Sequence, residues 1–278
     1  MGSLHNDKTV KLEQSLKQFG KVCIAFSGGV DSSFLLASAL ANLPRGNVLA
    51  VTARSVLLSL KDQERAQRGL DFFQQRFGLR YRILDWDPLE LPEINTNVKR
   101  RCYFCKDKLY TLFHKIIAEE GFPYLLDGTN ADDLLEDRPG LLALQQHGIR
   151  IPLADAGLSK KEIRLFSKKL GLETWDLPSS SCLATRMPTD APIDKLLLQE
   201  IALQEEQIAA LGFPGCRVRY GSPTGRDGAD GMTIQVEFDA SQYDEQLHLQ
   251  KEQEIRCVFT GLERMRIVFA RAKKSRLV

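Results

Sequence analysis

The sequence predicts an α/β protein, in which a doubly wound parallel sheet precedes a smaller α+β domain. Short apolar runs, typical of buried parallel strands, alternate with helical segments between residues 20 and 170. Beyond residue 190 the strands instead alternate between polar and apolar residues, which indicates a sheet with one exposed face. A Pro- and Ser-rich loop, 178–186, separates the two patterns, so we expect domains at 1–186 and 187–278.

Composition indicates a globular, cytoplasmic protein. The 278 residues are 43% hydrophobic and 27% charged, with a formal net charge of +2. No apolar run is as long as a membrane span, and the first 20 residues are too charged for a secretory signal. A charge this close to neutral argues against a protein that binds nucleic acid. Six cysteines in a cytosolic chain of this length do not indicate a disulfide framework.

Helices and strands follow one another along the first domain. We expect a helix over 4–19, a buried strand over 22–26 and an Ala- and Leu-rich helix from residue 34 to about residue 41. Gly78 and Gly171 each end a helix, as glycine commonly does. The other elements expected are strands at 47–52, 81–84 and 124–126, an edge strand at 149–153, and helices at 61–77, 107–120 and 159–170.

The second domain is expected to be a small sheet covered by helices. Its glycine-rich segment, 221–231, lies between the first two strands, and its basic tail, 271–276, is expected to be disordered. We interpret Cys216 and Cys257 as packing residues. The elements expected are helices at 193–211 and 242–258 and strands at 216–220, 233–238 and 264–269.

Period-two alternation gives this sheet a polar face. It places Arg217 and Arg219 on one side of their strand, and Gln235 and Glu237 on one side of the partner strand. Two arginines on a sheet face are either simply solvated or form a clamp for a phosphate or carboxylate. The sequence leaves both interpretations open.

The first strand leads into a turn that predicts a phosphate site. Strand, Gly-rich turn and helix together aim backbone N–H groups and a helix N-terminus at an anion, and glycines allow close approach. A carboxylate among phosphates requires a cation between them, so Asp31 predicts Mg²⁺. The alternative is an ordinary capped helix, for which one Ser or Asp would be enough. The turn consists of Ser27, Gly28, Gly29, Val30, Asp31, Ser32 and Ser33.

Polar residues also follow two other strands, and the carboxyl ends of parallel strands bind ligands. Asp132 or Asp133, after the strand at 124–126, can hold a second Mg²⁺. The alternatives are a solvated loop arginine at 54 and a capped helix start near residue 130. The candidate nucleotide-binding residues at these strand ends are Arg54, Thr129, Asn130, Asp132 and Arg138.

Three cysteines lie in polar segments. Cys102 and Cys105 belong to a basic stretch just ahead of the helix predicted at 107–120. A C-x-x-C at a helix N-terminus lowers thiol pKa values and suits a metal or a redox pair. Buried structural cysteines and half of a zinc site are the alternatives. Cys182 lies in the loop between the two domains.

The turn after the first strand resembles the S-G-G-x-D-S loop of the N-type ATP pyrophosphatases, or PP-loop proteins, which have an adenine nucleotide alpha hydrolase-like fold. G-T-N-x-x-D, at 128–133, is similar to their second recurring feature. The resemblance implies that ATP is cleaved between its α- and β-phosphates, with pyrophosphate in the loop and AMP passed to a substrate oxygen. It also implies that Arg54 lies near the AMP portion.

Residues 178–186 resemble the P-x-x-x-C-L-x-x-R signature of the LarE family. R-C-Y-x-C, R-P-G and V-R-Y extend the likeness over nearly the whole chain. LarE enzymes insert sulfur into a pyridinium biscarboxylic acid mononucleotide, on the way to the nickel-pincer cofactor of lactate racemase. The resemblance implies that sulfur displaces AMP from an adenylated carboxylate. Arg217 and Arg219 would hold the anionic substrate, with Arg186 assisting and Glu237 facing the same pocket.

One branch of that family gives up the sulfur of its own cysteine, and another carries a [4Fe–4S] cluster on three cysteines. Cys102, Cys105 and Cys182 make this chain similar to the cluster branch, with one iron left without a protein ligand. The alternatives are a sacrificial Cys182, a tRNA thiolase of the same superfamily, and a non-catalytic nucleotide-responsive Fe–S protein. We expect a homo-oligomer and leave its size open, a hexamer being one option.

Overall fold

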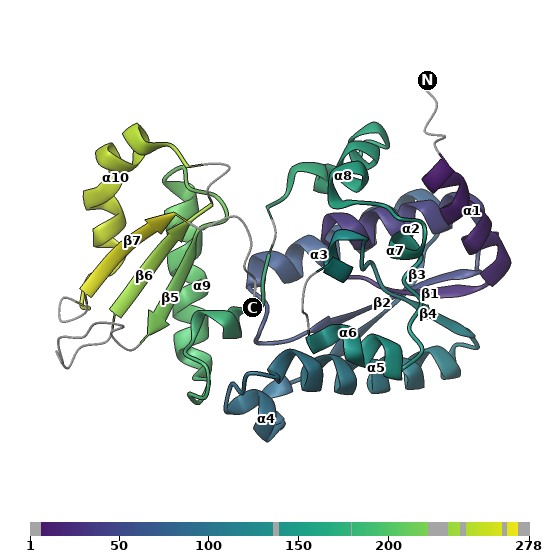
Figure 1. The fold of residues 1–278 in the computed structure, drawn as a ribbon, viewed down its shortest axis with the longest axis horizontal. Helices are drawn as coiled ribbons and strands as arrows, with labels where there is room; N and C mark the ends of the chain where they lie inside the picture. The colour runs from purple at the N-terminus through teal and green to yellow at the C-terminus, as the bar shows by residue number, and fades with distance from the viewer. Residues whose placement is uncertain are drawn as a thin grey trace. The chain divides into compact units, whose positions relative to one another are not determined.

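Two units divide the chain in the structure, which is a computed structural model (Figure 1). Unit 1 comprises Met1–Ser55, Lys61–Asp87 and Arg100–Leu177, and unit 2 comprises Val56–Leu60, Pro88–Lys99 and Pro178–Val278. Each unit has its own sheet. The residues that the structure describes are 7–135, 139–178, 180–221, 233–239, 243–262 and 266–271.

A parallel sheet of four strands organises unit 1, as the sequence predicts. Its strand order is β3-β2-β1-β4, so β1 (Val22–Ala25) lies between β2 (Val48–Arg54) and β4 (Tyr124–Leu126), with β3 (Arg80–Asp85) at one edge. The chain leaves β1 toward β2 on one side and returns to β4 on the other. This reversal makes the carboxyl ends of β1 and β4 a topological switch point, where open α/β sheets bind ligands.

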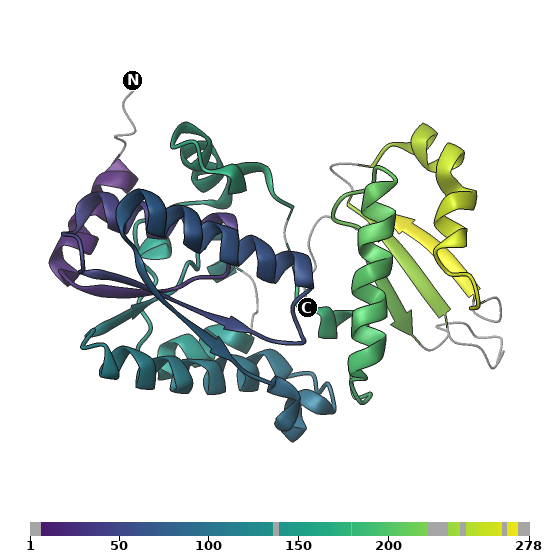
Figure 2. The same cartoon turned by 180° about the vertical axis from the view of Figure 1, so that it is seen from behind.

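Helices cover both faces of this sheet, which explains why β1 and most of β2 are apolar and buried. Figures 1 and 2 show helices lying along both faces of this sheet. Val22 and Ile24 of β1 point into the first core, and Cys23 points into the second. The first face carries α1 (Asp7–Phe19), α2 (Val30–Asn42), α3 (Leu60–Phe77), α7 (Pro152–Asp155) and α8 (Lys160–Lys169), and the second carries α5 (Arg101–Glu119) and α6 (Pro139–Gln146).

Two local predictions in unit 1 are wrong. The helix expected at 107–120 begins at Arg101, so Cys102 and Cys105 lie inside the first turns of α5 and not ahead of it. The edge strand expected at 149–153 is reduced to one bridge, between Leu126 and Arg150. Pro152 begins α7 there, because its fixed φ and missing N–H suit the first position of a helix.

A mixed sheet of three strands forms the centre of unit 2. β5 (Arg217–Gly221) runs antiparallel to β6 (Thr233–Phe238), and β7 (Arg266–Arg271) pairs with β6 in parallel. The predicted alternation is confirmed, since the inward residues of β5 and β6 are buried and the polar ones are partly exposed. The core between the sheet and its helices α9 (Lys195–Ala210) and α10 (Glu245–Cys257) includes Cys216, whereas Cys257 is exposed and is not the packing residue we expected.

Unit 2 also contains two short segments from the first half of the chain. One is Val56–Leu60; the other is Pro88–Lys99, which carries a 3₁₀ turn (Pro88–Glu90) and α4 (Pro92–Asn95). The division therefore differs from the expected domains, 1–186 and 187–278, because these segments pack with residues that follow Pro178. Along the described part of the chain, no helix combines the length and apolar composition that crossing a bilayer requires.

Candidate functional site

The turn between β1 and α2 has a backbone that two glycines make possible. Gly28 has a φ of 72°, and a Cβ atom there would lie 2.7 Å from the Cα of Ala66 in α3. Gly29 is the N-cap residue of α2 and offers no side chain to the first N–H groups of the helix. Ser32 is buried, and its hydroxyl donates to the Gly29 carbonyl at 3.2 Å. The serine shapes the turn, and the N-terminus of α2 suits an anion.

Asp31, in the first turn of α2, is partly buried beside a cation. Its carboxylate forms an ion pair with the Lys160 ammonium of α8, and the Asn130 side-chain amide donates to it at 3.5 Å. Burial raises the pKa of Asp31 above its ordinary value, although the charge of Lys160 opposes that rise. The nearby Asp133 carboxylate raises this pKa further. A divalent cation at this carboxylate would relieve both effects, so the site fits Mg²⁺.

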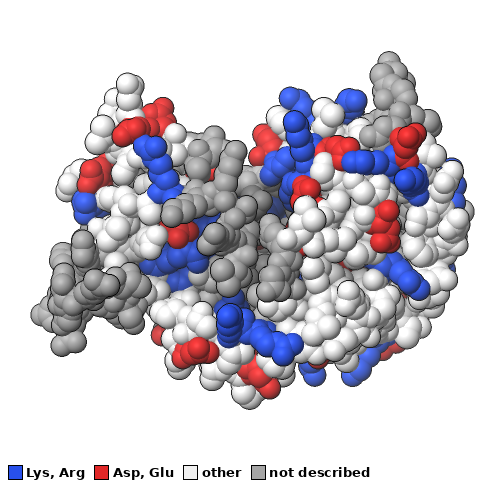
Figure 3. All heavy atoms as spheres, viewed as in Figure 1, with Lys and Arg blue, Asp and Glu red and all other residues white. Residues whose placement is uncertain are grey.

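Lys160 is a site residue that sequence reasoning missed. It is separated from Asp31 by 129 positions, so no local pattern links the two residues. The available signal was the capping box, because the box fixes where α8 begins and Lys160 is its first residue. Figure 3 shows Lys and Arg side chains gathered over α8.

The loop after β4 packs directly on the glycine turn. A Cβ atom on Gly128 would lie 2.9 Å from the Ser32 nitrogen, so only glycine permits this approach. Thr129 and Asn130 are buried, and the Asn130 carboxamide accepts from the Asp132 nitrogen at 2.9 Å. Asp132 in turn accepts from the Lys160 nitrogen at 2.8 Å. The polar residues predicted from β1 and β4 therefore meet at one edge of the sheet, and they also anchor α8.

Asp127, the first residue after β4, stays ionised in this setting. Burial alone would raise its pKa, but the Lys106 charge and hydrogen bonds from Thr129 and Tyr110 outweigh burial and lower it. The Thr129 nitrogen donates to this carboxylate at 2.9 Å, and the Tyr110 hydroxyl donates at 2.9 Å. Asp127 thus holds the loop that carries Thr129 and Asn130.

The arginines expected near the nucleotide have different positions. Arg54 ends β2 and donates to the Gln67 side chain at 2.8 Å, so it lies at the carboxyl ends of the strands as expected. Arg138 lies outside the described residues. Arg65, which sequence reasoning missed, donates to the Gly28 carbonyl at 3.3 Å and pairs with Asp62 at 2.5 Å. It therefore supports the glycine turn from α3.

Cys102 and Cys105 lie three residues apart in the first turns of α5, so both occupy one side of the helix. Cys102 is exposed and Cys105 is partly buried. Burial raises the pKa of Tyr110 most, and the charges of Asp127 and Cys105 raise it further, so Cys105 lies within electrostatic reach of Tyr110. Two thiols on one helical side fit two ligands of a metal or cluster. Among the described residues, no three His, Cys, Asp or Glu side chains gather into a metal-binding group.

Cys182 precedes a 3₁₀ turn, Leu183–Arg186, in unit 2. Arg186 is 4% exposed, and its guanidinium binds both carboxylate oxygens of Glu205 in α9, at 2.7 and 3.0 Å. The same guanidinium donates to the Ser181 hydroxyl at 2.5 Å. Arg186 thereby connects the Cys182 loop to α9 through hydrogen bonds and an ion pair.

The polar face of β5 and β6 holds the other predicted substrate residues. Glu237 forms an ion pair with the Arg219 guanidinium at 2.9 Å. This ion pair explains why a carboxylate lies on a face that also carries two arginines. Burial lowers the pKa of Arg217 most, and the charges of Arg186 and Arg219 lower it further. Glu237 and Glu205 oppose that shift. Three guanidinium groups thus share two carboxylates, and the remaining positive charge suits an anionic ligand.

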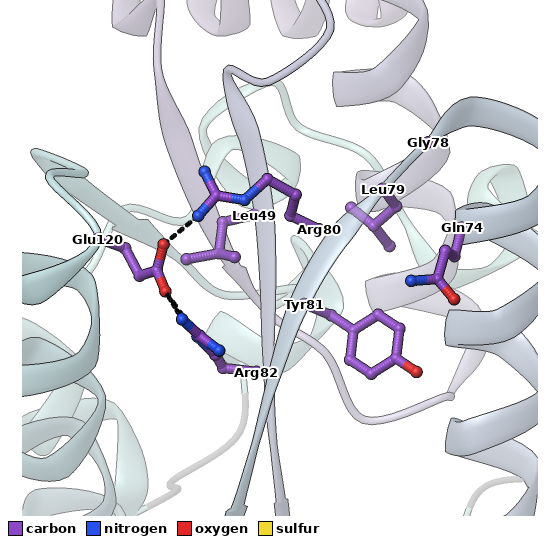
Figure 4. Close-up of a pocket in the computed structure, with 8 residues that line it drawn as sticks. All are labelled: Leu49, Gln74, Gly78, Leu79, Arg80, Tyr81, Arg82 and Glu120. Carbon is purple, nitrogen blue, oxygen red and sulfur yellow. Dashed lines mark hydrogen bonds and ion pairs between the residues drawn. The ribbon is translucent and has the colours of Figure 1, made fainter.

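A separate hollow of about 420 Å³ lies at the other end of the unit 1 sheet (Figure 4). Arg80 and Arg82 of β3 both form ion pairs there with Glu120. Arg80 is the first residue of its strand, so the hollow lies away from the carboxyl ends that carry the glycine turn. The other lining residues are Leu49, Gln74, Gly78, Leu79 and Tyr81.

A parallel sheet with a glycine turn after β1 and a polar loop after β4, both at the switch point, defines a nucleotide-binding α/β protein. The PP-loop domain family matches residues 4–155. The chain belongs to the PP-loop proteins and, within them, to the LarE family that its motifs indicate.

Three relatives cover about three quarters of the chain. An uncharacterized protein of Synechocystis is 35% identical over 212 residues, which are 76% of this chain and 77% of the relative. The pyridinium-3,5-bisthiocarboxylic acid mononucleotide synthase of Lactiplantibacillus plantarum is 31% identical over 213 residues, 77% of this chain and 76% of the synthase. An uncharacterized protein of Methanocaldococcus jannaschii is 31% identical over 215 residues, 76% of this chain and 80% of that protein. These similarities support an enzyme that uses ATP.

Proposed function

We propose that this protein is an ATP-dependent sulfur transferase that acts on pyridinium-3,5-biscarboxylic acid mononucleotide, for the nickel-pincer cofactor of lactate racemase. The observation that carries the proposal is the Asp31 carboxylate, held beside the Lys160 ammonium at the N-terminus of α2. The 31% identity to the bisthiocarboxylic acid mononucleotide synthase supports the choice of substrate.

The first step is the adenylation of a substrate carboxylate. A carboxylate oxygen attacks the α-phosphorus of ATP, the bond to the bridging oxygen breaks, and pyrophosphate leaves. Gly28, Gly29 and the N-terminus of α2 bind the pyrophosphate. Asp31 would hold Mg²⁺, which would supply positive charge against the charge that builds up on the phosphates. Lys160 lies beside Asp31 and supplies a second positive charge to the same phosphates.

The second step replaces the activated oxygen with sulfur. A sulfur nucleophile attacks the carbonyl carbon of the adenylate, the C–O bond to AMP breaks, and a thiocarboxylate remains. Arg217 and Arg219 bind the phosphate of the mononucleotide, and Glu237 orients Arg219 for that contact. Arg186 acts indirectly, because it fastens the loop that presents Cys182.

Cys102, Cys105 and Cys182 would hold a [4Fe–4S] cluster, and such a cluster would supply the sulfide for transfer. The basic residues around the C-x-x-C favour the thiolate forms that ligation needs. The positions of Cys102 and Cys105 on one side of α5 support their acting together. We also infer that the protein works in the cytoplasm and as a homo-oligomer, without a membrane or nucleic acid partner.

An anaerobic comparison of cysteine variants tests the proposal. Cys102→Ala, Cys105→Ala and Cys182→Ala should each lose the brown chromophore and sulfur transfer, while all three still release pyrophosphate from ATP. Cys257→Ala is the matched control, because Cys257 is also exposed and should leave both properties unchanged. Bound zinc would be colourless and lack acid-labile sulfide.

Other outcomes would replace parts of the proposal. Formation of ADP and phosphate would rule out adenylation. A protein without iron that becomes lighter by one H₂S at Cys182 after a turnover would make Cys182 the sulfur donor. A gel shift with tRNA would favour a tRNA thiolase.

A further inference from the structure

Asn97 holds the loop that follows Cys182 through hydrogen bonds. The two are far apart in the sequence but belong to the same unit, unit 2. The Asn97 carboxamide nitrogen lies 2.6 Å from the Pro188 carbonyl oxygen, and 3.3 Å from those of Ala184 and Met187. An amide nitrogen has two hydrogens, so three carbonyls converge on two donors. Asn97 is 1% exposed, which makes these hydrogen bonds costly to lose because water does not replace them.

The backbone of Asn97 is as unusual as its side chain. Its φ is 55°, in the left-handed region, which costs a residue other than glycine about 1 kcal/mol. Asparagine tolerates this region better than most residues do. The Asn97 nitrogen donates to the Ile94 carbonyl at 3.0 Å, and its carbonyl accepts from the Asp190 nitrogen at 3.1 Å. This left-handed residue therefore bonds to the Cys182 loop through both its side chain and its main chain.

Further contacts connect this fastening to Cys182 itself. The Cys182 carbonyl accepts from the Thr185 nitrogen at 3.0 Å and from its hydroxyl at 2.7 Å. The Leu183 nitrogen donates to the Leu57 carbonyl at 2.9 Å, so the segment Val56–Leu60 of unit 2 also holds this turn. Asn97 and Leu57 thus fix residues 183–188 immediately after the thiol.

We propose that Asn97 is the positioning residue of the Cys182 thiol. The proposal rests on the proposed role of Cys182, but not on whether Cys182 is a ligand or a donor. Asn97 donates hydrogen bonds to the carbonyls of Ala184, Met187 and Pro188. These bonds restrict the loop to one conformation and keep the Cys182 sulfur in one position. A thiol displaced by about 1 Å can lose on the order of a hundredfold in rate.

Asn97→Gly isolates the side chain, because glycine adopts a φ of 55° without strain and lacks the carboxamide. In this variant we expect sulfur transfer to fall about tenfold or more, while pyrophosphate release from ATP stays unchanged. In the metal-free protein, iodoacetamide should alkylate Cys182 faster, because the loop no longer holds the thiol in one conformation. Peptide mass spectrometry gives that rate for Cys182 alone.

Asp190→Gly is the matched control. Asp190 is exposed, lies in the same loop and also has a positive φ, 61°, so the substitution relieves the same strain without removing the side-chain bonds of Asn97. It should leave both readouts as in the wild type. Wild-type rates of alkylation and transfer in Asn97→Gly would overturn the proposal.

A second measurement covers the case in which Asn97→Gly does not fold. Hydrogen exchange on the wild-type protein should show slow exchange at Leu183 and Thr185, whose amides donate to the carbonyls of Leu57 and Cys182. Fast exchange at both amides would overturn the proposal without any variant. If Cys182→Ala keeps full sulfur transfer, the proposed function of Cys182 fails, whereas the alkylation and exchange results still report on the fastening.

Discussion

At the scale of single residues, Asp31 is a carboxyl group whose ionised form is disfavoured by its burial in the folded protein. Burial raises the pKa of Asp31 even though Lys160 and Asn130 stabilise its ionised form. A carboxyl group with a raised pKa in the folded state destabilises the protein when it is ionised. The charge is therefore best explained by a ligand, and a cation that accompanies a polyphosphate would offset its cost.

Asp31→Asn should separate function from stability. We expect pyrophosphate release to fall on the order of a hundredfold, because the phosphates lose the carboxylate that holds their cation. Thermal unfolding at pH 7 should occur at the same or a higher temperature, because the ionised group no longer has to be buried. In the wild type, Asp31 should become protonated at a pH above its ordinary pKa of 3.8. Pyrophosphate release should weaken as the pH falls through that range.

Asp155→Asn is the control for this experiment. Burial also raises the pKa of Asp155, which lies in α7 of the same unit, but the charge that opposes this rise is Arg150, which is not a predicted site residue. The variant should release pyrophosphate at the wild-type rate. Full activity in Asp31→Asn, or equal losses in both variants, would contradict the assignment of Asp31.

At the scale of elements, α8 matters because its first residue is Lys160. Ser159 and Glu162 form a reciprocal capping box at its start, and Glu162 also pairs with Lys8 of α1 at 2.8 Å. The Asp132 carboxylate accepts from the first nitrogen of the helix. Three separate contacts thus determine where α8 begins, and with it the position of the Lys160 ammonium.

The pH dependence of stability should report on Glu162. Hydrogen bonds from Lys8 and Ser159 lower its pKa from 4.5 to about 2, so the stabilisation is complete above pH 4.5 and is lost as the pH falls toward 2. Glu162→Gln should unfold at a lower temperature than the wild type at pH 7, and the difference should vanish near pH 2. We expect at most about 1 kcal/mol, because Lys8 and Glu162 are partly exposed.

Glu254→Gln is the matched control, since Glu254 also pairs with a lysine, Lys251, at 2.7 Å but is half-exposed in α10. This variant should unfold like the wild type at every pH. A pH-independent difference for Glu162→Gln would mean that the cap, and not the charge, stabilises α8.

Sequence patterns predict a helix or strand well where the residues that form it and the residues that end it are neighbours in the sequence. The four strands of unit 1 are confirmed, because β1, β2 and β4 are short, mostly apolar runs and β3 carries Tyr81, Ile83 and Leu84 between turn residues. The start of α5 was predicted too late, because Arg100 at its N-cap provides no side-chain hydrogen bond and so leaves no sequence signal. The turn with Asp31 was recognisable for the same local reason, whereas its partner Lys160 was not.

At the scale of the whole molecule, unit 2 is assembled from three stretches of chain. The expected boundary near residue 186 followed the change in strand pattern, which is a local signal. The contacts that bring 56–60 and 88–99 into unit 2 join residues about ninety or more positions apart, such as Asn97 and Pro188. Sequence composition does not encode such contacts, and this is why the fastening of the Cys182 loop was not predictable.

The two units should lose different functions when their charges are removed. Arg217→Gln should weaken binding of the mononucleotide by roughly 1.5–3 kcal/mol and leave ATP affinity nearly unchanged, because it removes a charge-assisted contact from unit 2 only. Calorimetric titration with each ligand measures both affinities. Equal losses for the two ligands would contradict separate sites.

Arg186→Ala should behave differently from Arg217→Gln, although both remove a guanidinium from the same cluster. Arg186 is buried and paired, so its removal leaves Glu205 without its bidentate partner, at a cost of about 3–5 kcal/mol. We expect a lower unfolding temperature for Arg186→Ala. Unchanged stability would restore Arg186 as a candidate substrate ligand.

The hydrogen bonds from Asn97 to the Cys182 loop also determine when this part of unit 2 can form during synthesis of the chain. Asn97 leaves the ribosome long before its acceptor, because 91 positions separate it from Pro188. At about 5–20 residues per second the nascent chain waits roughly 5–18 s for that partner. Until then the segment 88–99 has no partner from the later part of unit 2. Slower translation between these positions should therefore lengthen the window in which chaperones bind and proteases cut the nascent chain.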